Sequence, residues 1–337
     1  MQSAIVKSHP ISSNLGPHNS RKNNLLNAQG SISDSQPKWK LGLAAAVGAQ
    51  VLWGIFPLFL KLFSGVVHPV DLVAHRAIWS FALLAILVRL FSGASKESES
   101  PNLRQRLFGN AATIRTALFA TVFILINWLV FVWSVDTGHA LDASFGYYIC
   151  PQFVVLLGVV FLRERLNRTQ WIAIALAAFG VLIMSGSRQS NVWIGLVIAA
   201  AFAFYALVKK KTHLSAIEGL TLETGFMLLP AIAFLCWRST IETGTAFPDS
   251  PRMWLLLICC GPMTVAPLFL YAVAVKHISL STAGLLQFIG PTIQFLLGVF
   301  AFGEPVDSTR LFGFVFVWVG VSIYLFALFK GRAVKSD

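Results

Sequence analysis

Charged residues are scarce in this sequence. Only 12% of its 337 residues are Asp, Glu, Lys or Arg, and 56% are hydrophobic, whereas soluble domains carry about 25% charged residues. So few polar groups cannot cover the surface of a water-soluble protein of this length. The composition therefore predicts a protein that is surrounded by lipid.

Several motifs of catalysis and energy coupling are missing as well. The sequence has no Walker-type nucleotide-binding loop, no G-x-S-x-G nucleophile elbow and no His/Cys spacing typical of a metal site. Its four cysteines lie in apolar stretches without C-x-x-C spacing, so they predict neither a metal site nor a disulfide. We expect no cofactor, no metal and no enzymatic activity, and any solute movement must draw its energy from a gradient.

The sequence is instead rich in apolar runs that are long enough to cross a bilayer as helices, which takes roughly 18 residues or more. Only a short "KHIS" separates the eighth run from the ninth, but Gly261, Pro262, Pro267 and Pro291 argue against one unbroken helix there. The prediction is an all-α integral membrane protein with ten spans, at 41–63, 70–91, 113–134, 143–162, 170–187, 192–208, 217–237, 253–275, 279–301 and 311–329.

Both ends of the chain are predicted to lie outside the bilayer. Residues 1–40 are rich in Ser and Asn, hold one acid, Asp34, and have no apolar run long enough for a secretory signal. They predict a disordered cytoplasmic tail, with an organelle transit peptide as the alternative. Residues 330–337 predict a cytoplasmic C-terminal tail.

Positive charges are distributed unevenly between the two sides of the predicted membrane. With a cytoplasmic N-terminus, 20 Lys and Arg residues fall in cytoplasmic segments, and four, Arg188, Arg238, Arg252 and Arg310, fall in outside segments. This excess follows the positive-inside rule and predicts a multi-pass protein of the cell (inner) membrane with both termini in the cytoplasm. Anionic inner-leaflet lipid then explains the net charge of +12, and no nucleic-acid partner is needed.

One segment of the sequence recurs. "SFGYYICPQFVVLLGVVFLRERLNRTQ" at 144–170 returns 140 residues later as "GLLQFIGPTIQFLLGVFAFGEPVDSTR" at 284–310, with the same Pro, Gly and Glu spacing, and the pattern extends to Gly180 and Gly320. The sequence therefore predicts two homologous halves, 41–187 and 192–329. Each half has five spans, an odd number, so the second half must be inverted relative to the first. Inverted repeats with interrupted helices are typical of secondary transporters, whose substrate site lies between the halves.

A series of motifs along the chain, taken together, resembles the RarD branch of the EamA transporters, within the drug/metabolite transporter (DMT) superfamily. They include "WGIFPLFLK", "AHRAIWS", "LDASFGYYICP", "LTLETGFMLLP", "GPMTVAPLFLYA" and "LLQFIGPTIQFLLGVFAFGEP", and the resemblance covers about 39–330. One departure is Cys150, where this branch usually has Asn before the Pro. The resemblance implies a ten-helix inner-membrane permease, linked by family to chloramphenicol sensitivity.

The leading hypothesis is thus a secondary active transporter, or permease, that moves a small organic metabolite or drug by alternating access. Its partners would be a small-molecule substrate and membrane lipids, and a homodimer is left open. The alternative is a membrane-embedded protein without transport activity, such as a lipid-handling enzyme or a sensor. A channel is disfavoured because no ring of repeated charges is found.

Two charges within apolar spans are the first candidates for the site, because an ionisable group there costs a few kcal/mol or more and is functional by default. These are Arg76 and Glu223, and Glu223 is the one acid expected to be buried in a span. Aligning Asp71 with Glu218 aligns Arg76 with Glu223 in the repeat. Arg76 would pair with an anionic or zwitterionic substrate, and Glu223 would bind its amine or carry a coupling proton. Snorkelling to the interface or helix capping is the alternative for both.

The remaining candidates are polar or aromatic residues in the spans and the prolines that would interrupt them. Asn127 could instead tie two helices together, and His75, on a different helix face from Arg76, could be an interfacial hydrogen-bonder. The prolines free a carbonyl one turn back, for which a simple kink is the alternative. The full set is Trp53, His75, Asn127, Tyr147, Gln287 and Gln294, with interruptions at Pro57, Pro151 and Pro291. Glu164 and Glu304, at span ends, are better explained by capping.

Overall fold

The computed structural model describes residues 17–92, 107–137, 139–185, 192–241, 247–301 and 308–333. Within these ranges the regular elements are helices, without a strand. They are α1 (Pro17–Lys61), α2 (Pro69–Ser92), α4 (Ala111–Asp136), α5 (Ala140–Leu162), α6 (Arg168–Ser185), α7 (Val192–Lys211), α8 (Ala216–Ile241), α9 (Pro251–His277), α10 (Leu280–Leu286), α11 (Ile289–Ala301) and α12 (Ser308–Ala333).

Ten apolar segments on the described helices correspond to the ten predicted spans. Eight are at least 18 residues long, and two, Gly146–Leu162 and Arg168–Met184, are shorter. The ninth, Leu280–Ala301, consists of α10 and α11. A helix satisfies all its backbone hydrogen bonds internally, which a chain in hydrocarbon requires. The prediction of an all-α membrane protein with ten spans is confirmed.

The chain forms two compact units, residues 1–41 and residues 42–337. The first includes the beginning of α1, which starts at Pro17 within the segment predicted to be a tail. The second includes the rest of α1 and all other helices, and α12 continues to Ala333 within the predicted C-terminal tail.

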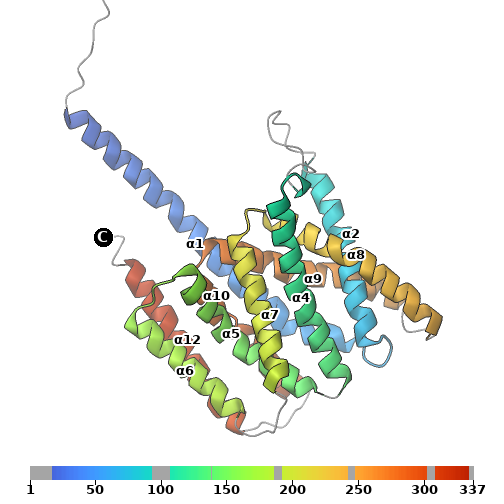
Figure 1. The fold of residues 1–337 in the computed structure, drawn as a ribbon. Coiled ribbons are helices and arrows are strands. Elements are labelled where there is room, and N and C mark those ends of the chain that lie inside the picture. The colour runs from blue at the N-terminus through green and yellow to red at the C-terminus, as the bar shows by residue number, and fades with distance from the viewer. Residues whose placement is uncertain are drawn as a thin grey trace, which may run out of the picture. The chain divides into compact units, whose positions relative to one another are not determined.

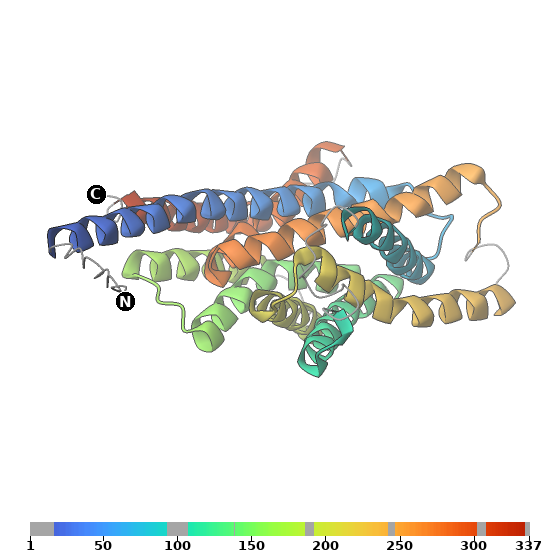
Figure 2. The same cartoon turned by 90° about the horizontal axis from the view of Figure 1, so that it is seen from above.

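The helices of residues 42–337 pack mainly across the two halves of the chain. α6 packs on α12, α5 on α7 and α10, and α2 on both α8 and α9 (Figure 1). Seen from above, the part of α1 that begins at Gly42 runs beside α9 (Figure 2), and a Cβ atom on Gly42 would lie 2.6 Å from Cβ of His277. Each of these pairs joins a helix of the first half to one of the second, so neither half forms a separate core.

Glycines allow α6 and α12 to approach each other closely. A Cβ atom on Gly180 would lie 2.5 Å from the carbonyl oxygen of Gly313, and one on Gly320 would lie 2.6 Å from that of Ala173. Gly180 and Gly320 are equivalent positions of the repeat. Small residues at such a contact let the helix backbones pack directly, which is a main source of helix association in lipid.

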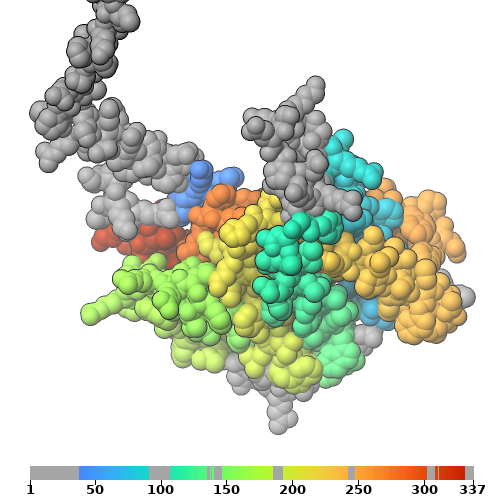
Figure 3. All heavy atoms as spheres, turned by 45° about the horizontal axis from the view of Figure 1, so that its top comes forward, coloured from blue at the N-terminus to red at the C-terminus, as the bar shows by residue number. Residues whose placement is uncertain are grey.

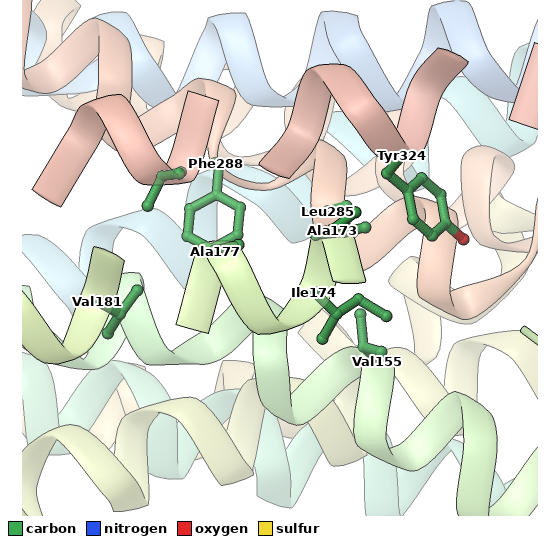
Figure 4. Packing of buried hydrophobic residues seen from close by; sticks show 9 residues of the cluster. Val155, Ala173, Ile174, Ala177, Val181, Leu285, Phe288 and Tyr324 are labelled. Atoms are coloured by element: carbon green, nitrogen blue, oxygen red, sulfur yellow. The ribbon is translucent and has the colours of Figure 1, made fainter. Parts of the chain in front are cut away.

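A hydrophobic cluster surrounds this glycine contact and includes side chains of four helices. Figure 4 shows Phe288 and Tyr324 from the second half against Ala177 and Ile174 of α6 and Val155 of α5. The cluster fixes α6 and α12 against the junction between α10 and α11. It therefore positions the part of the ninth span that reaches the site.

The outward face of the bundle is apolar. In Figure 3, α4 lies between α7 and α8 on the side facing the viewer, in agreement with its packing on both helices. Large side chains on α4 are exposed there, namely Leu118, Phe119, Val122, Ile126, Leu129 and Trp133. Such an extended apolar surface marks contact with lipid. The protein is thus a multi-pass membrane protein.

Of the three predicted helix interruptions, only the one at Pro291 lies beside a break. Pro291 has no N–H to donate to the carbonyl of Gln287, one turn earlier, and the helix ends at Leu286 and restarts at Ile289. The predictions for Pro57 and Pro151 were wrong, because α1 and α5 continue through them. At Pro57 the freed carbonyl is that of Trp53, and it accepts a hydrogen bond from Nε2 of Gln294 at 3.1 Å. That side chain replaces the donor that proline removes.

Candidate functional site

A cavity of about 550 Å³ lies between the two halves of the chain. Its walls come from α1, α2, α4 and α5 of the first half and from α7, α9, α11 and the α10–α11 junction of the second. The cavity reaches the surface at the turn between α1 and α2, where the lining residues Ser64 and Gly65 are exposed. Its volume is within the range of roughly 300–1,000 Å³ that small-molecule sites occupy.

Most of the residues singled out from the sequence line this cavity. The structure brings together Trp53, Pro57, Arg76, Asn127, Tyr147, Gln287, Pro291 and Gln294. Tyr147 and Gln287 occupy equivalent positions in the two halves, so the repeat places a polar side chain on each side of the cavity. Three candidates, His75, Pro151 and Glu223, are not in its lining.

Arg76 is the charged residue among the described residues that line the cavity. Its Nε donates a hydrogen bond to Oγ1 of Thr264 on α9 at 3.0 Å. The guanidinium carbon lies 4.3 Å from the ring centroid of Trp128 and 5.1 Å from that of Phe56. These cation–π contacts hold the guanidinium plane. α1, α2, α4 and α9 together therefore fix one positive charge at the wall.

Three amide side chains at the cavity are held by hydrogen bonds from their nitrogens. Asn127 Nδ2 donates to the carbonyl of Ile198 at 2.9 Å and so ties α4 to α7, as the structural alternative for this residue predicts. Gln287 Nε2 donates to the hydroxyl of Tyr271 at 2.9 Å. With Gln294 bound to Trp53, the three amides have fixed orientations, so the polar surface of the cavity is preformed.

The rest of the wall is largely aromatic. The ring of Trp53 packs against Phe202 at 5.7 Å and against Tyr271 at 5.6 Å between centroids. Phe131 packs edge-to-face on Tyr147 at 5.6 Å. Flat apolar rings beside a few fixed polar groups are typical of sites that bind organic molecules.

Two polar residues of the site, Gln50 and Thr264, are missing from the sequence-based candidates. Gln50 is 4% exposed, lines the cavity, and precedes Trp53 by three positions on the same helix face. A polar residue in the middle of the first apolar span was the available signal. Thr264 is 2% exposed, and its role depends on α9 packing against α2, which no local pattern predicts.

Glu223 lies outside the cavity lining, in a buried ion pair. Its Oε1 accepts from Nζ of Lys209 at 2.7 Å and its Oε2 from the Tyr205 hydroxyl at 3.2 Å. Lys209 and Glu223 are 1% and 3% exposed, so each neutralises the other away from water. The pair joins α7 to α8. The role of Glu223 in binding or coupling stays a prediction.

We expected Glu223 to be the one acid buried in a span, and this expectation was wrong because Asp71 and Glu218 are buried as well. Asp71 is fully buried and binds Arg238 with Nε–Oδ1 at 3.1 Å, joining α2 to α8. Glu218 is buried as well, and its Oε2 accepts from the backbone N–H of Ser215 at 2.9 Å as part of a capping box on α8. A partner from a distant helix makes burial of Asp71 tolerable, and the local sequence does not reveal that partner.

His75 points away from Arg76, as expected for neighbours on a helix. It is 2% exposed and packs edge-to-face with Trp254 at 6.0 Å and Phe247 at 6.2 Å. It is therefore a packing residue between α2 and α9 and does not contribute to the wall of the cavity.

The end of the bundle opposite the α1–α2 turn is held together by polar contacts. Besides the Lys209–Glu223 pair, Lys210 Nζ donates to the carbonyl of Ile278 at 2.6 Å, and Lys276 Nζ donates to that of Leu214. Cations at helix C-termini complement the helix dipole and the unpaired carbonyls there.

Glu164 contributes to the same end. Its carboxylate accepts from the N–H groups of Leu280 at 2.6 Å and Ser281 at 2.9 Å. Capping by Glu164 is therefore confirmed, but the capped helix is α10 of the other half. Glu304 lies outside the described residues. We refer to the contacts of Lys209–Glu223, Lys210, Lys276 and Glu164 as the polar latch.

Comparison with known proteins agrees with this architecture. The model of the EamA-like transporter family matches twice, at residues 40–186 and 190–326. Each match contains five of the ten spans, so the two repeats are confirmed, and their odd number of spans gives them opposite orientations in the membrane. A solved structure titled "Crystal structure of protein" has the same fold, with a TM-score of 0.62 and 16% identity, over 85% of this chain and 97% of its own.

Curated relatives are similar over nearly the whole chain. An uncharacterized transporter of Vibrio cholerae serotype O1 is 38% identical over 296 residues, which cover 87% of this chain and 94% of the relative. The protein RarD of Escherichia coli K12 is 36% identical over 285 residues, covering 84% of this chain and 93% of its own. The chain belongs to the EamA-like transporter family, in its RarD branch, and is a membrane transporter of the DMT type.

Proposed function

We propose that this protein is a secondary active transporter that carries a small organic molecule across the cell membrane by alternating access. The observation that carries the proposal is the cavity between the repeats, which reaches the surface at the α1–α2 turn while the polar latch joins the helix ends on the opposite side. A site open at one end and closed at the other is one half of an alternating-access cycle.

The charge distribution supports an orientation for this cycle. With both termini in the cytoplasm, as the positive-inside rule favours, the polar latch faces the cytoplasm and the cavity opens outside. Lys209, Lys210 and Lys276 of the latch are among the 20 cytoplasmic basic residues. The inner membrane is the expected location.

The cycle requires the two ends to exchange states. Opening the cytoplasmic end must separate Lys209 from Glu223 and the Glu164 carboxylate from the start of α10. Closing the outer end must bring α1 and α2 toward the second half, where Asp71 and Arg238 already join α2 to α8. The energy would come from a gradient, with Glu223 as the proposed carrier of a coupling proton.

Metabolite accumulation tests the proposal and does not require an identified substrate. Small organic molecules are measured inside and outside cells that produce the protein and cells that do not. Leu268→Trp fills the cavity, because Leu268 lines it, whereas Leu255→Trp adds the same bulk to the lipid-facing side of the same helix, where Leu255 is 62% exposed. We expect at least one compound to change its distribution with the wild type and Leu255→Trp, but not with Leu268→Trp.

A compound found in this way is then loaded into proteoliposomes for exchange and gradient-driven uptake. Correct folding of each variant is verified by its elution from the membrane fraction, after solubilisation in detergent, as a monodisperse protein. If no compound responds to the inserted wild type, transport is excluded, and the sensor or lipid-handling alternative is favoured.

A further inference from the structure

We propose that the cavity binds organic anions, which carry one carboxylate or phosphate group held by Arg76 and an aromatic or otherwise apolar body packed against the rings of the wall. The inference rests on the proposed function in that the bound anion would be the transported molecule. Family membership does not identify the substrate, but the residues that line the cavity indicate its charge and shape.

The first argument is charge balance. Among the described residues that line the cavity, Arg76 is charged and none is Asp or Glu. The buried cation Lys209 and the half-buried Arg238 both pair with a carboxylate, but Arg76 contacts Thr264 and two aromatic rings. Arg76 is half-buried, and a partly desolvated cation without a counter-charge becomes more favourable when an anion joins it. The cavity therefore favours a ligand with a negative charge.

The second argument is the orientation of the guanidinium. Oγ1 of Thr264 accepts a hydrogen bond from Nε of Arg76, and the rings of Trp128 and Phe56 hold the plane of the guanidinium. In the described part of the chain no acceptor binds Nη1 or Nη2, so both terminal nitrogens can donate to a ligand. Arginine binds a carboxylate or phosphate through two parallel hydrogen bonds, and a guanidinium that is already fixed loses little entropy in doing so.

Two further polar side chains in the lining make no hydrogen bond with the residues that the structure describes. Gln50, which is 4% exposed, has an amide that can both donate and accept, and Tyr147 has a hydroxyl. Tyr147 and Arg76 line the same cavity. Gln50 is buried and Tyr147 is half-buried, and a bound anion supplies a hydrogen-bond acceptor for each side chain.

The third argument concerns the rest of the ligand. Trp53, Phe131 and Phe202 provide flat apolar surface around the polar groups, and aromatic rings prefer such partners. An additional amine on the ligand would meet no acid among the lining residues that the structure describes, because Glu223 and Asp71 are outside the lining and each already binds a basic residue. An anion is therefore favoured over the zwitterion that the sequence alone left open.

The test compares ligands of similar shape and different charge. Binding of benzoate, phenyl phosphate, phenylalanine, phenethylamine and benzyl alcohol to the purified protein in detergent is measured by titration calorimetry and by the unfolding temperature. We expect benzoate or phenyl phosphate to bind at least tenfold more tightly than the zwitterion, the cation and the alcohol, because hydrogen bonds to charged groups are the strong ones. The tighter of the two anions identifies the head group.

Three variants link the effect to Arg76. Arg76→Gln should abolish the preference for anions. Arg76→Lys should keep the preference but weaken binding, because lysine retains the positive charge but lacks the two parallel N–H donors of the guanidinium. Arg252→Gln removes an exposed arginine at the start of α9 and should bind like the wild type. Should Arg76→Gln not fold, the ligand series on the wild type and Arg76→Lys still decides the question.

Equal affinity for anion and alcohol, binding by neither anion, or a preference that survives Arg76→Gln would overturn the inference. Binding in detergent needs no gradient, so its outcome is separate from that of the transport experiment. Anion-selective binding without transport would overturn the proposed function alone. Transport of cations or neutral molecules without anion binding would overturn this inference alone.

Discussion

Lys209 and Glu223 are opposite charges that are buried together inside the bundle and neutralise each other. Both are almost fully buried, and the distance between Nζ and Oε1 is 2.7 Å. Removing one partner of such a pair leaves the other as an uncompensated buried charge, which typically costs about 3–5 kcal/mol, whereas removing both costs much less. The stability of the polar latch thus depends on the match between the two residues.

We predict that Glu223→Gln lowers the free energy of unfolding by about 3 kcal/mol or more and that adding Lys209→Gln restores most of the loss. Chemical unfolding in detergent of both single variants, the double variant and the wild type gives the coupling energy. Lys211→Gln, at an exposed neighbour of Lys209, serves as the control. Losses that simply add in the double variant would show that the pair does not matter to stability.

The double variant Glu223→Gln/Lys209→Gln can also be used to test the proposed proton coupling, because it lacks the titratable carboxyl of Glu223 but is expected to fold. If Glu223 carries the proton, pH-gradient-driven uptake into proteoliposomes is lost while exchange of substrate for substrate continues. Unchanged gradient-driven uptake in the correctly inserted variant rules out Glu223 as the carrier.

At the scale of elements, the break between α10 and α11 determines what the ninth span presents to the cavity. It lies where Pro291 cannot donate to the carbonyl of Gln287, and both residues line the cavity. A continuous helix would turn the side chain of Gln287 relative to that of Gln294. The shape of the site therefore depends on one missing backbone donor.

We expect Pro291→Ala to restore that hydrogen bond, to join α10 with α11 and to reduce substrate binding and transport about tenfold. The unfolding temperature should stay the same or rise, because proline is about 3 kcal/mol less favourable than alanine within a helix. Pro230→Ala, at an exposed proline inside α8, is the matched control. Unaltered binding by Pro291→Ala would contradict a role for the break.

A substitution at Gly320 tests whether close backbone contact holds α6 and α12 together. Gly320→Val places a branched side chain against the backbone of Ala173, where even a Cβ atom would lie 2.6 Å from the carbonyl oxygen. We expect a loss of roughly 1–3 kcal/mol or more from overpacking. Ala175→Val, on the exposed side of α6, should have little effect on the unfolding curve. A wild-type-like curve for Gly320→Val would show that the two helices can separate freely.

Features that arise within one span were predictable from the sequence. An apolar run in lipid must be a helix, so the ten spans, and with them Arg76, Tyr147 and Gln287, could be placed from the order of residues alone. Features that need a second helix were not predictable. Lys209 belongs to a "KKK" run that is typical of an interface, and only the ion pair across the α7–α8 turn brings its side chain to Glu223.

At the scale of the whole molecule, the two halves are similar in sequence but differ in the charges they place inside. Arg76 and Glu223 are equivalent positions of the repeat, yet Arg76 lines the cavity and Glu223 belongs to the polar latch. One end of the bundle is thus open and the other closed, although the repeat alone would make them alike. The sequence could predict the symmetry but not this difference.

The inverted arrangement predicts which turns face outside. The turn before α12 should be outside, and the α7–α8 turn should be cytoplasmic. In a Cys236→Ser background, Ser308→Cys should react with an impermeant thiol reagent in intact cells, and His213→Cys should react only after lysis. Both positions are exposed. Protection of Ser308→Cys until lysis would contradict the proposed orientation.

The glycine contact between α6 and α12 also has a consequence for biosynthesis. α6 is complete when Ser185 has been added, but its partner starts at Ser308, and ribosomes need on the order of ten seconds to make the chain between them. During that interval the Gly180 face of α6 borders lipid or an insertion factor. A nascent chain that stalls before α12 would leave this face uncovered, so the packing of the first repeat is completed by a helix that is made much later, in the second repeat.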